Sequence, residues 1–483
     1  MDRARMTAGE DNERQEARAK GHRRYLSSWH IYLSIILSVI FVLFFFWLAR
    51  FLMGKPLVTI TNKDFKNLSK PADYDPNLDA APLYLSLIRE FSEIPRPVAE
   101  YLGSWPTDVN TDDLQTISDW LTEKGEAIES AQQAASRPYC WTPGKNALQE
   151  KIVWLPDVGR ALLCRSILNA YRGQYQSAAE DLVTCYKAGK QLAGPKPIVE
   201  QLVGLVMRAS VVEAAFTILA YSPQDEQLIR LFDESFQQLI PADSTFFDLQ
   251  YEKLFWTYQI QRAFTENGRG DGHLLPSIRY VATYQALPDK SETVQWKYKP
   301  SVLDYTPRNI WYAATCPRKT QTLELLEKCF VHLQKVALVS PKESRGKTNK
   351  KLKELQAEVN EKSFLKSSPW TGSHMELIER ARRIRINELG LLVTLKILSY
   401  KLEKGEFPQS LDDVAAAGYI EYLPMDPYSD GSLVYRRRGD DFLLYSLGVD
   451  FDDDGGVRSQ WGEDETGGDQ VFWPVERPDG KSN

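Results

Sequence analysis

The chain has 483 residues, of which 43% are apolar and 26% are charged, values close to those of an average globular protein. This composition excludes a wholly disordered chain and a polytopic membrane protein, and the length predicts two or three domains. The formal net charge of −6 argues against nucleic acid as a partner, because nucleic-acid-binding proteins carry an excess of positive charge. Five cysteines are too few for a disulfide-rich scaffold.

One apolar segment dominates the N-terminal region. Residues 29–49 include no Asp, Glu, Lys or Arg, and about 20 apolar residues are enough for a helix to cross a bilayer. Trp29 and Trp47 lie at its two ends, where aromatic side chains favour the membrane interfaces. A cleaved signal peptide is the alternative, but the run is longer than the usual signal-peptide core and no small-residue cleavage site follows it. The sequence therefore predicts an uncleaved transmembrane helix.

The charges on either side of this helix predict its orientation. Residues 1–28 form a basic tail with seven Lys or Arg and five Asp or Glu, whereas Arg50 and Lys55 are the nearest cations on the far side. Lys and Arg are in excess on cytoplasmic flanks. We therefore expect a single-pass protein of the cytoplasmic (inner) membrane, with a cytoplasmic N-terminus and the bulk of the chain outside the cytoplasm.

Residues 73–338 are predicted to form a mainly helical extracytoplasmic domain. Arg208 and Glu213 interrupt its most apolar segment, which favours a buried helix over a second membrane span. Gly173, Tyr175 and Ala178 match one tetratricopeptide repeat, but the sequence has no second copy, so an ordinary helical hairpin is favoured. Apolar residues recur at helical spacing over Arg160–Arg172, Tyr175–Gln191, Glu200–Tyr221 and Asp225–Leu239.

The remainder divides into a linker and a terminal module. Residues 340–373 are rich in Lys and are predicted to be a charged linker with a short helix at 351–366. Residues 374–476 are predicted to form a small α+β module, which starts with an amphipathic helix over Glu376–Glu403. Short strands are expected at Leu433–Arg436 and Asp441–Ser446.

Several short motifs follow one another in this module. They are GEFP at 405–408, LPMDPY at 423–428, Tyr435, YSLGVD at 445–450, the pair Gly455–Gly456, and Asp469 with Trp473. In this order they resemble the C-terminal part of the type II secretion major pseudopilin. The resemblance implies a pseudopilin-like fold for the module and a calcium ion in its loop. The whole layout also resembles membrane-anchored proteins of planctomycete-type bacteria, which supplies an architecture and no activity.

The acidic run at 450–455 is the one candidate site. Its D-x-D-x-D-G spacing places Asp450, Asp452 and Asp454 at alternate positions, and carboxylates in a tight turn can converge on a hard cation such as Ca²⁺. The pseudopilin resemblance adds Asp469 and implies that Asp450 and Asp469 are calcium ligands, whereas Asp452 and Asp454 rest on the spacing alone. The alternative is a solvated acidic loop without a bound ion. We expect a structural Ca²⁺ that orders a loop with few apolar residues.

No catalytic motif is found in the sequence. It has no H-E-x-x-H, no G-x-S-x-G and no phosphate-binding glycine loop, so no catalytic or cofactor-binding residue is assigned. The leading hypothesis is a non-enzymatic, membrane-anchored envelope protein, whose helical domain is a scaffold or interaction surface for envelope proteins. Two alternatives stay open. One is a membrane-tethered hydrolase of cell-wall or other polymeric substrates, and the other is an accessory component of a type II secretion-like apparatus.

Overall fold

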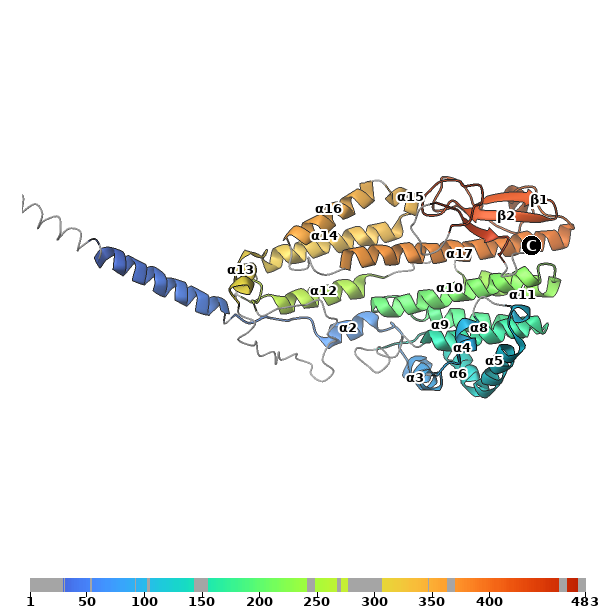
Figure 1. Cartoon of the computed structure of the whole chain (residues 1–483), viewed down its shortest axis with the longest axis horizontal. Coiled ribbons are helices and arrows are strands. Elements are labelled where there is room, and N and C mark those ends of the chain that lie inside the picture. The colour runs from blue at the N-terminus through green and yellow to red at the C-terminus, as the bar shows by residue number, and fades with distance from the viewer. Residues whose placement is uncertain are drawn as a thin grey trace, which may run out of the picture. The chain divides into compact units, whose positions relative to one another are not determined.

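The structure is a computed structural model of the chain (Figure 1). The basic tail predicted over residues 1–28 lies outside the residues that it describes. Those residues are 29, 31–52, 54–91, 93–101, 105–142, 155–240, 248–266, 271–276, 306–345, 347–362, 370–459 and 467–476.

Contacts divide the chain into two units, which we describe separately. The first unit comprises residues 1–57, 262–279 and 300–319. The second comprises residues 58–261, 280–299 and 320–483.

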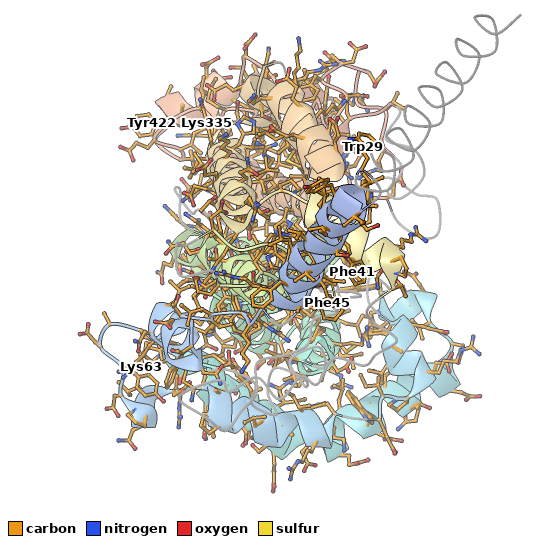
Figure 2. All side chains as sticks on the ribbon, turned by 90° about the vertical axis from the view of Figure 1, so that its left-hand side faces the viewer. Trp29, Phe41, Phe45, Lys63, Lys335 and Tyr422 are labelled. Atoms are coloured by element: carbon orange, nitrogen blue, oxygen red, sulfur yellow. The ribbon has the colours of Figure 1, made fainter. Side chains whose placement is uncertain are left out.

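The first unit contains an N-terminal apolar helix, Ile31–Leu52, and the short helix α13 (Pro307–Thr315). None of the most apolar part of the N-terminal helix is buried by the rest of the protein. Phe41 and Phe45, labelled in Figure 2, are 67% and 63% exposed. The predicted apolar helix is therefore present and is long enough to cross a membrane.

The C-terminal end of this helix is held by a later segment of the same unit. The ring of Phe51 stacks on the ring of His273, with 3.9 Å between centroids, and the Nε2 atom of His273 lies 3.0 Å from the Phe51 carbonyl oxygen. Pro56 and Thr265 form an antiparallel bridge beside this contact. Burial lowers the pKa of His273, so the ring is neutral at pH 7.

The second unit is mainly helical and includes almost all of α12 and α14. Its helices are α2 (Asn62–Ser69), α3 (Ala81–Glu90), α4 (Arg96–Glu100), α5 (Thr111–Glu123), α6 (Gly125–Ser136), α8 (Leu155–Tyr171), α9 (Tyr175–Lys190), α10 (Ile198–Tyr221), α11 (Glu226–Leu239), α12 (Gln250–Ala263), α14 (Lys319–Leu338), α15 (Pro341–Ser344), α16 (Lys347–Lys362), α17 (Trp370–Lys404) and α18 (Leu411–Ala416), with 3₁₀ turns at Pro76–Leu78 and Pro106–Asp108.

The predicted hairpin around Gly173 is formed by α8 and α9. Gly173 has φ +72°, a left-handed conformation that glycine adopts without steric cost, and it ends α8. Ala178 of α9 is fully buried beneath α8, and its carbonyl oxygen accepts a hydrogen bond of 2.8 Å from Ser166. Small residues at the crossing therefore allow the two helices to approach closely.

Helix α10 is the central helix of this unit. It packs on α8, α9 and α17, and 67% of its most apolar window is buried. Gly189 of α9 and Gly204 of α10 face each other, and a Cβ atom on Gly189 would lie 2.7 Å from the Gly204 carbonyl oxygen. This close approach brings α9 directly against α10, and α8 and α17 cover further parts of its apolar surface.

The charge that interrupts α10 has a buried partner. The Arg208 guanidinium donates hydrogen bonds of 3.0 and 2.6 Å to the Glu388 carboxylate of α17, and the Tyr186 hydroxyl of α9 donates to the same oxygen over 2.8 Å. Arg208 is 5% exposed and Glu388 is 0% exposed. Together with Tyr186, the pair therefore joins α9 and α10 to α17, which is distant from both in the sequence.

A three-stranded antiparallel sheet packs on α17. Its strands are β1 (Val434–Arg438), β2 (Asp441–Ser446) and β3 (Gln470–Trp473), in the order β1-β2-β3. The sequence predicts the first two strands and not the third. Phe472 of β3 lies against Gly390 of α17, where any Cβ atom would clash with the ring. One continuous hydrophobic core contains residues of α3–α6, α8–α11, α17 and the sheet.

The region predicted as a linker also contains helices. Helix α16 (Lys347–Lys362) begins and ends four residues earlier than the helix predicted at 351–366. Helix α17 begins at Trp370, six residues before the predicted start at Glu376. The fold class is confirmed in its coarse form, a mainly helical chain with a small sheet and an N-terminal apolar helix.

We expect Glu388→Leu to lower the free energy of unfolding by roughly 3–5 kcal/mol, because it leaves the Arg208 guanidinium buried without this carboxylate. The double variant Arg208→Met/Glu388→Leu removes both charges and should be more stable than the single variant. Urea denaturation of the detergent-solubilised chain, followed by tryptophan fluorescence, measures both. If the double variant is no more stable than Glu388→Leu, the buried Arg208 charge is not costly without Glu388, and the ion pair does not have the role that we assign to it.

A second buried carboxyl, Glu252 of α12, lies at the N-terminus of α10. Its Oε1 atom accepts a hydrogen bond of 3.1 Å from the Ile198 amide, and within the described residues its Oε2 atom is buried without a hydrogen-bond partner. Burial raises the pKa of Glu252 to about 7.

Because this folded-state pKa exceeds that of an unfolded Glu, the folded state takes up the proton more readily. Protonated Glu252 therefore contributes to the free energy of unfolding at pH 4, and this contribution is lost as the pH rises to 7. We expect a loss of about 3 kcal/mol over this interval for the wild type. Glu252→Gln should remove that part of the pH dependence, whereas Glu234→Gln, on the exposed surface of α11, should not. Equal pH profiles for wild type and Glu252→Gln in urea denaturation would refute this assignment.

Candidate functional site

The acidic loop connects β2 to β3 in the C-terminal module. Its first anchor is Asp426, which is 2% exposed and belongs to the LPMDPY motif. The Asp426 carboxylate accepts hydrogen bonds from the Tyr428 amide (2.9 Å), the Ser446 hydroxyl (2.8 Å) and the Leu447 amide (2.9 Å). Asp426 therefore fixes the turn before β1 to the end of β2, where the acidic loop begins.

The far end of the loop is fixed by backbone contacts with the start of β3. The Asp469 amide donates to the Val457 carbonyl oxygen over 2.6 Å, and the Ser459 amide donates to the Asp469 carbonyl oxygen over 3.0 Å. Gly468 has φ +113°, and a Cβ atom there would lie 2.7 Å from Ser459. Only glycine therefore fits where the two segments meet.

Two of the four predicted calcium ligands, Asp450 and Asp454, accept hydrogen bonds from the same backbone amide. The Gly468 amide donates to the Asp450 carboxylate over 3.0 Å and to the Asp454 carboxylate over 2.9 Å. Two carboxylates that share one N–H group must lie close together. Asp452 does not share this donor; its carboxylate accepts a hydrogen bond of 3.1 Å from the neighbouring Asp453 amide.

Asp469 is the buried member of the set. Its side chain is 0% exposed, and its Oδ2 atom accepts a hydrogen bond of 2.7 Å from the Gly456 amide. Among the described residues its Oδ1 atom is buried without a partner. Burial raises the pKa of Asp469 to about 6, and the negative charges of Asp453 and Asp454 add to this effect. An unpartnered, buried carboxylate oxygen is costly unless a cation or a proton satisfies it.

Asp453 has a structural role that the spacing rule overlooks. Its carboxylate accepts a hydrogen bond of 2.7 Å from the Tyr445 hydroxyl of β2 and forms an ion pair of 3.3 Å with Arg436 of β1. The bond from Tyr445 is the main reason that the pKa of Asp453 is lowered. In the sequence, Tyr445 of the YSLGVD motif is the residue from which this hydrogen bond to the acidic loop could have been predicted.

The donor set fits a hard cation only in part. Oxygen ligands from carboxylates suit Ca²⁺, and Asp450, Asp454 and Asp469 converge on the segment that holds Gly468. As they stand, however, no three Asp, Glu, His or Cys side chains in the described part of the chain are close enough together to hold a metal ion. Asp450 and Asp454 would have to turn from the Gly468 amide toward the ion.

Comparisons with protein-family models, with curated proteins and with solved structures find no match to this chain. The pseudopilin resemblance and the calcium site that it implies therefore stay predictions from the residues.

We expect Ca²⁺ to raise the melting temperature of the detergent-solubilised full chain by a few degrees, since an ion at 100 times its Kd stabilises the folded state by about 3 kcal/mol. Asp469→Asn should abolish this shift, because it removes the buried anionic oxygen. Asp440→Asn, an exposed acid in the β1–β2 turn, is the matched control and should keep it. An equal shift in Asp469→Asn, or none in the wild type, would exclude Ca²⁺ from this loop.

Proposed function

We propose that this protein is a membrane-anchored scaffold of the cell envelope. In this proposal the N-terminal helix crosses the cytoplasmic membrane once, and the helical unit outside the cytoplasm presents surfaces to envelope proteins. The C-terminal module ends the scaffold, and its acidic loop is clamped by a structural Ca²⁺.

The observation that carries the proposal is the solvent-exposed apolar helix Ile31–Leu52. None of its most apolar window is covered by protein, whereas 67% of the corresponding window of α10 is. Phe44, Phe45 and Phe46 are each more than half exposed, and so large an apolar surface in water would be costly. A bilayer removes this cost, because the helix satisfies its own backbone hydrogen bonds and its side chains are apolar.

The continuous core of the second unit supports a scaffold. Its hydrophobic cluster extends from α3 through α11 to α17 and the sheet, so the C-terminal module is packed on the helices. The buried Arg208–Glu388 pair strengthens the same connection. A surface built on such a core keeps its shape when a partner binds, which lowers the entropic cost of binding.

The calcium part of the proposal is supported by Asp469. Its buried Oδ1 atom is the type of atom that a structural cation satisfies, and the glycine-rich backbone around it has few apolar side chains to order it.

Membrane insertion is tested by alkaline carbonate extraction of membranes from a bacterial host that expresses the full chain. We expect the wild type to stay in the membrane pellet. Val42→Arg/Leu43→Arg should move to the supernatant, because each Arg near the helix centre costs about 2.5–3.5 kcal/mol. In spheroplasts, external protease should digest the helical unit and spare an epitope fused before residue 1. Release of the wild type by carbonate, or mass-spectrometric detection of cleavage after the apolar helix, would overturn the proposal.

A further inference from the structure

An open groove lies along one face of α9, between α6 and α11. It encloses about 560 Å³, a size typical of ligand sites, and α9 packs against both neighbouring helices. We call it the α9 groove. Its polar lining includes Gln132 of α6, Gln176, Glu180, Thr184 and Lys187 of α9, and Gln238 of α11.

Two opposite charges stand along the groove. Glu180 and Lys187 are both exposed and lie seven residues apart on α9, which corresponds to about 10 Å along the helix axis. The lining has no other charged side chain among the described residues. The Gln176 amide donates one hydrogen bond of 2.8 Å to the Glu180 carboxylate and neutralises none of its charge. A ligand that pairs with both charges would therefore carry a cation and an anion about 10 Å apart.

Hydrogen bonds within the protein already orient two side chains of the lining, Gln132 and Thr184. The Gln132 amide nitrogen lies 3.4 Å from Asp181, which is fully buried and is held by Arg165 through hydrogen bonds of 2.9 and 2.6 Å. The Thr184 hydroxyl donates to the Glu180 carbonyl oxygen over 2.7 Å. The side-chain oxygen of Gln132, which is half-buried, can therefore act as an acceptor, whereas Thr184 is almost completely buried.

The other wall of the groove offers donors. Gln238 of α11 is exposed, and Ser235 lies one turn before it. An amide and a hydroxyl can donate to carbonyl oxygens, while the acceptors across the groove can take up N–H groups. An extended polypeptide presents N–H and C=O groups on both of its edges, so its backbone matches this lining.

We propose that the α9 groove binds a short extended peptide segment of a partner protein. The segment places a Lys or Arg side chain beside Glu180 and an Asp or Glu side chain beside Lys187, three residues apart. Three residues of extended or polyproline-type chain cover about 9–10 Å, which matches the spacing of the two charges. This inference rests on the proposed scaffold function and names the chemistry of its partner.

A polysaccharide is the competing ligand for an envelope protein, and the lining disfavours it. None of the described residues that line the groove is aromatic, so no ring is present for a sugar to stack on. The aliphatic floor, which includes Val183, suits a small apolar side chain between the two charged ones.

Selection of a phage-displayed random heptapeptide library on the detergent-solubilised full chain tests the proposal. We expect enriched peptides to carry opposite charges three residues apart. The variant Lys187→Glu, which places two acidic side chains along the groove, should instead enrich peptides with two basic residues three positions apart. With one enriched peptide, labelled for fluorescence anisotropy, Lys187→Glu should raise Kd at least tenfold. Lys190→Glu, an exposed residue outside the groove, should leave Kd within twofold.

Three results would overturn the proposal: no enriched charge pattern, the same peptides selected by the Lys187→Glu variant, or specific binding of cell-wall glycan fragments in place of peptides. Circular dichroism of each variant checks folding, and the substituted side chains are exposed. Peptide binding is measured on solubilised protein, so a protein released by carbonate extraction can still bind peptide. Failure here and failure of membrane anchoring are therefore distinguishable.

Discussion

The buried ion pair between Arg208 of α10 and Glu388 of α17 is the interaction on which the arrangement of the second unit depends. Its two side chains are almost completely desolvated, and 180 residues of sequence separate them. Desolvating a charge is costly, and Glu388 is stabilised there by Arg208 and, at 3.6 Å from its other oxygen, by Arg385 of the same helix. The Tyr186 hydroxyl adds a third helix to the oxygen that Arg208 binds. The pair consequently specifies how α17 lies on α10 more strictly than apolar packing could, because an apolar contact tolerates small shifts of one helix along the other.

This constraint extends to the C-terminal module through α17. Gly390 follows Glu388 by two residues and accommodates the ring of Phe472, so the ion pair and the sheet contact lie within one turn of the same helix. The loop between β2 and β3 is in turn attached to the sheet by Tyr445 and Asp453. The loop therefore rests on a rigid base, while its own carboxylates repel one another. A cation would relieve that repulsion without altering the base.

The sequence predicts the helices well, because apolar residues recur at helical spacing through α8–α11 and α17. Arg208 is itself the signal that α10 is a buried soluble helix, but the sequence contains nothing that identifies Glu388 as its partner. β3 is missed because it is short and three of its four residues are buried, so it lacks the alternation of a half-exposed strand. The domain boundaries, the orientation in the membrane and the partners stay predictions.

The candidate site is predictable only in part, for a reason found in the backbone. The D-x-D-x-D spacing assumes that alternate side chains point the same way, but Phe451 has φ +67° and breaks the alternation. Asp450 and Asp454 still meet, whereas Asp452 points to solvent and Asp453 turns to the sheet. Asp469 is brought in by the pairing of residues 457–459 with the start of β3, which local spacing cannot reveal.

Hydrogen–deuterium exchange of the full chain, with and without Ca²⁺, tests the calcium-clamped module most directly. Our account predicts that Ca²⁺ slows exchange in peptides that cover residues 448–459 and 467–473 and leaves the exchange of α8–α11 unchanged. Unchanged exchange in the loop at millimolar Ca²⁺, or slowing spread evenly over the chain, would contradict it.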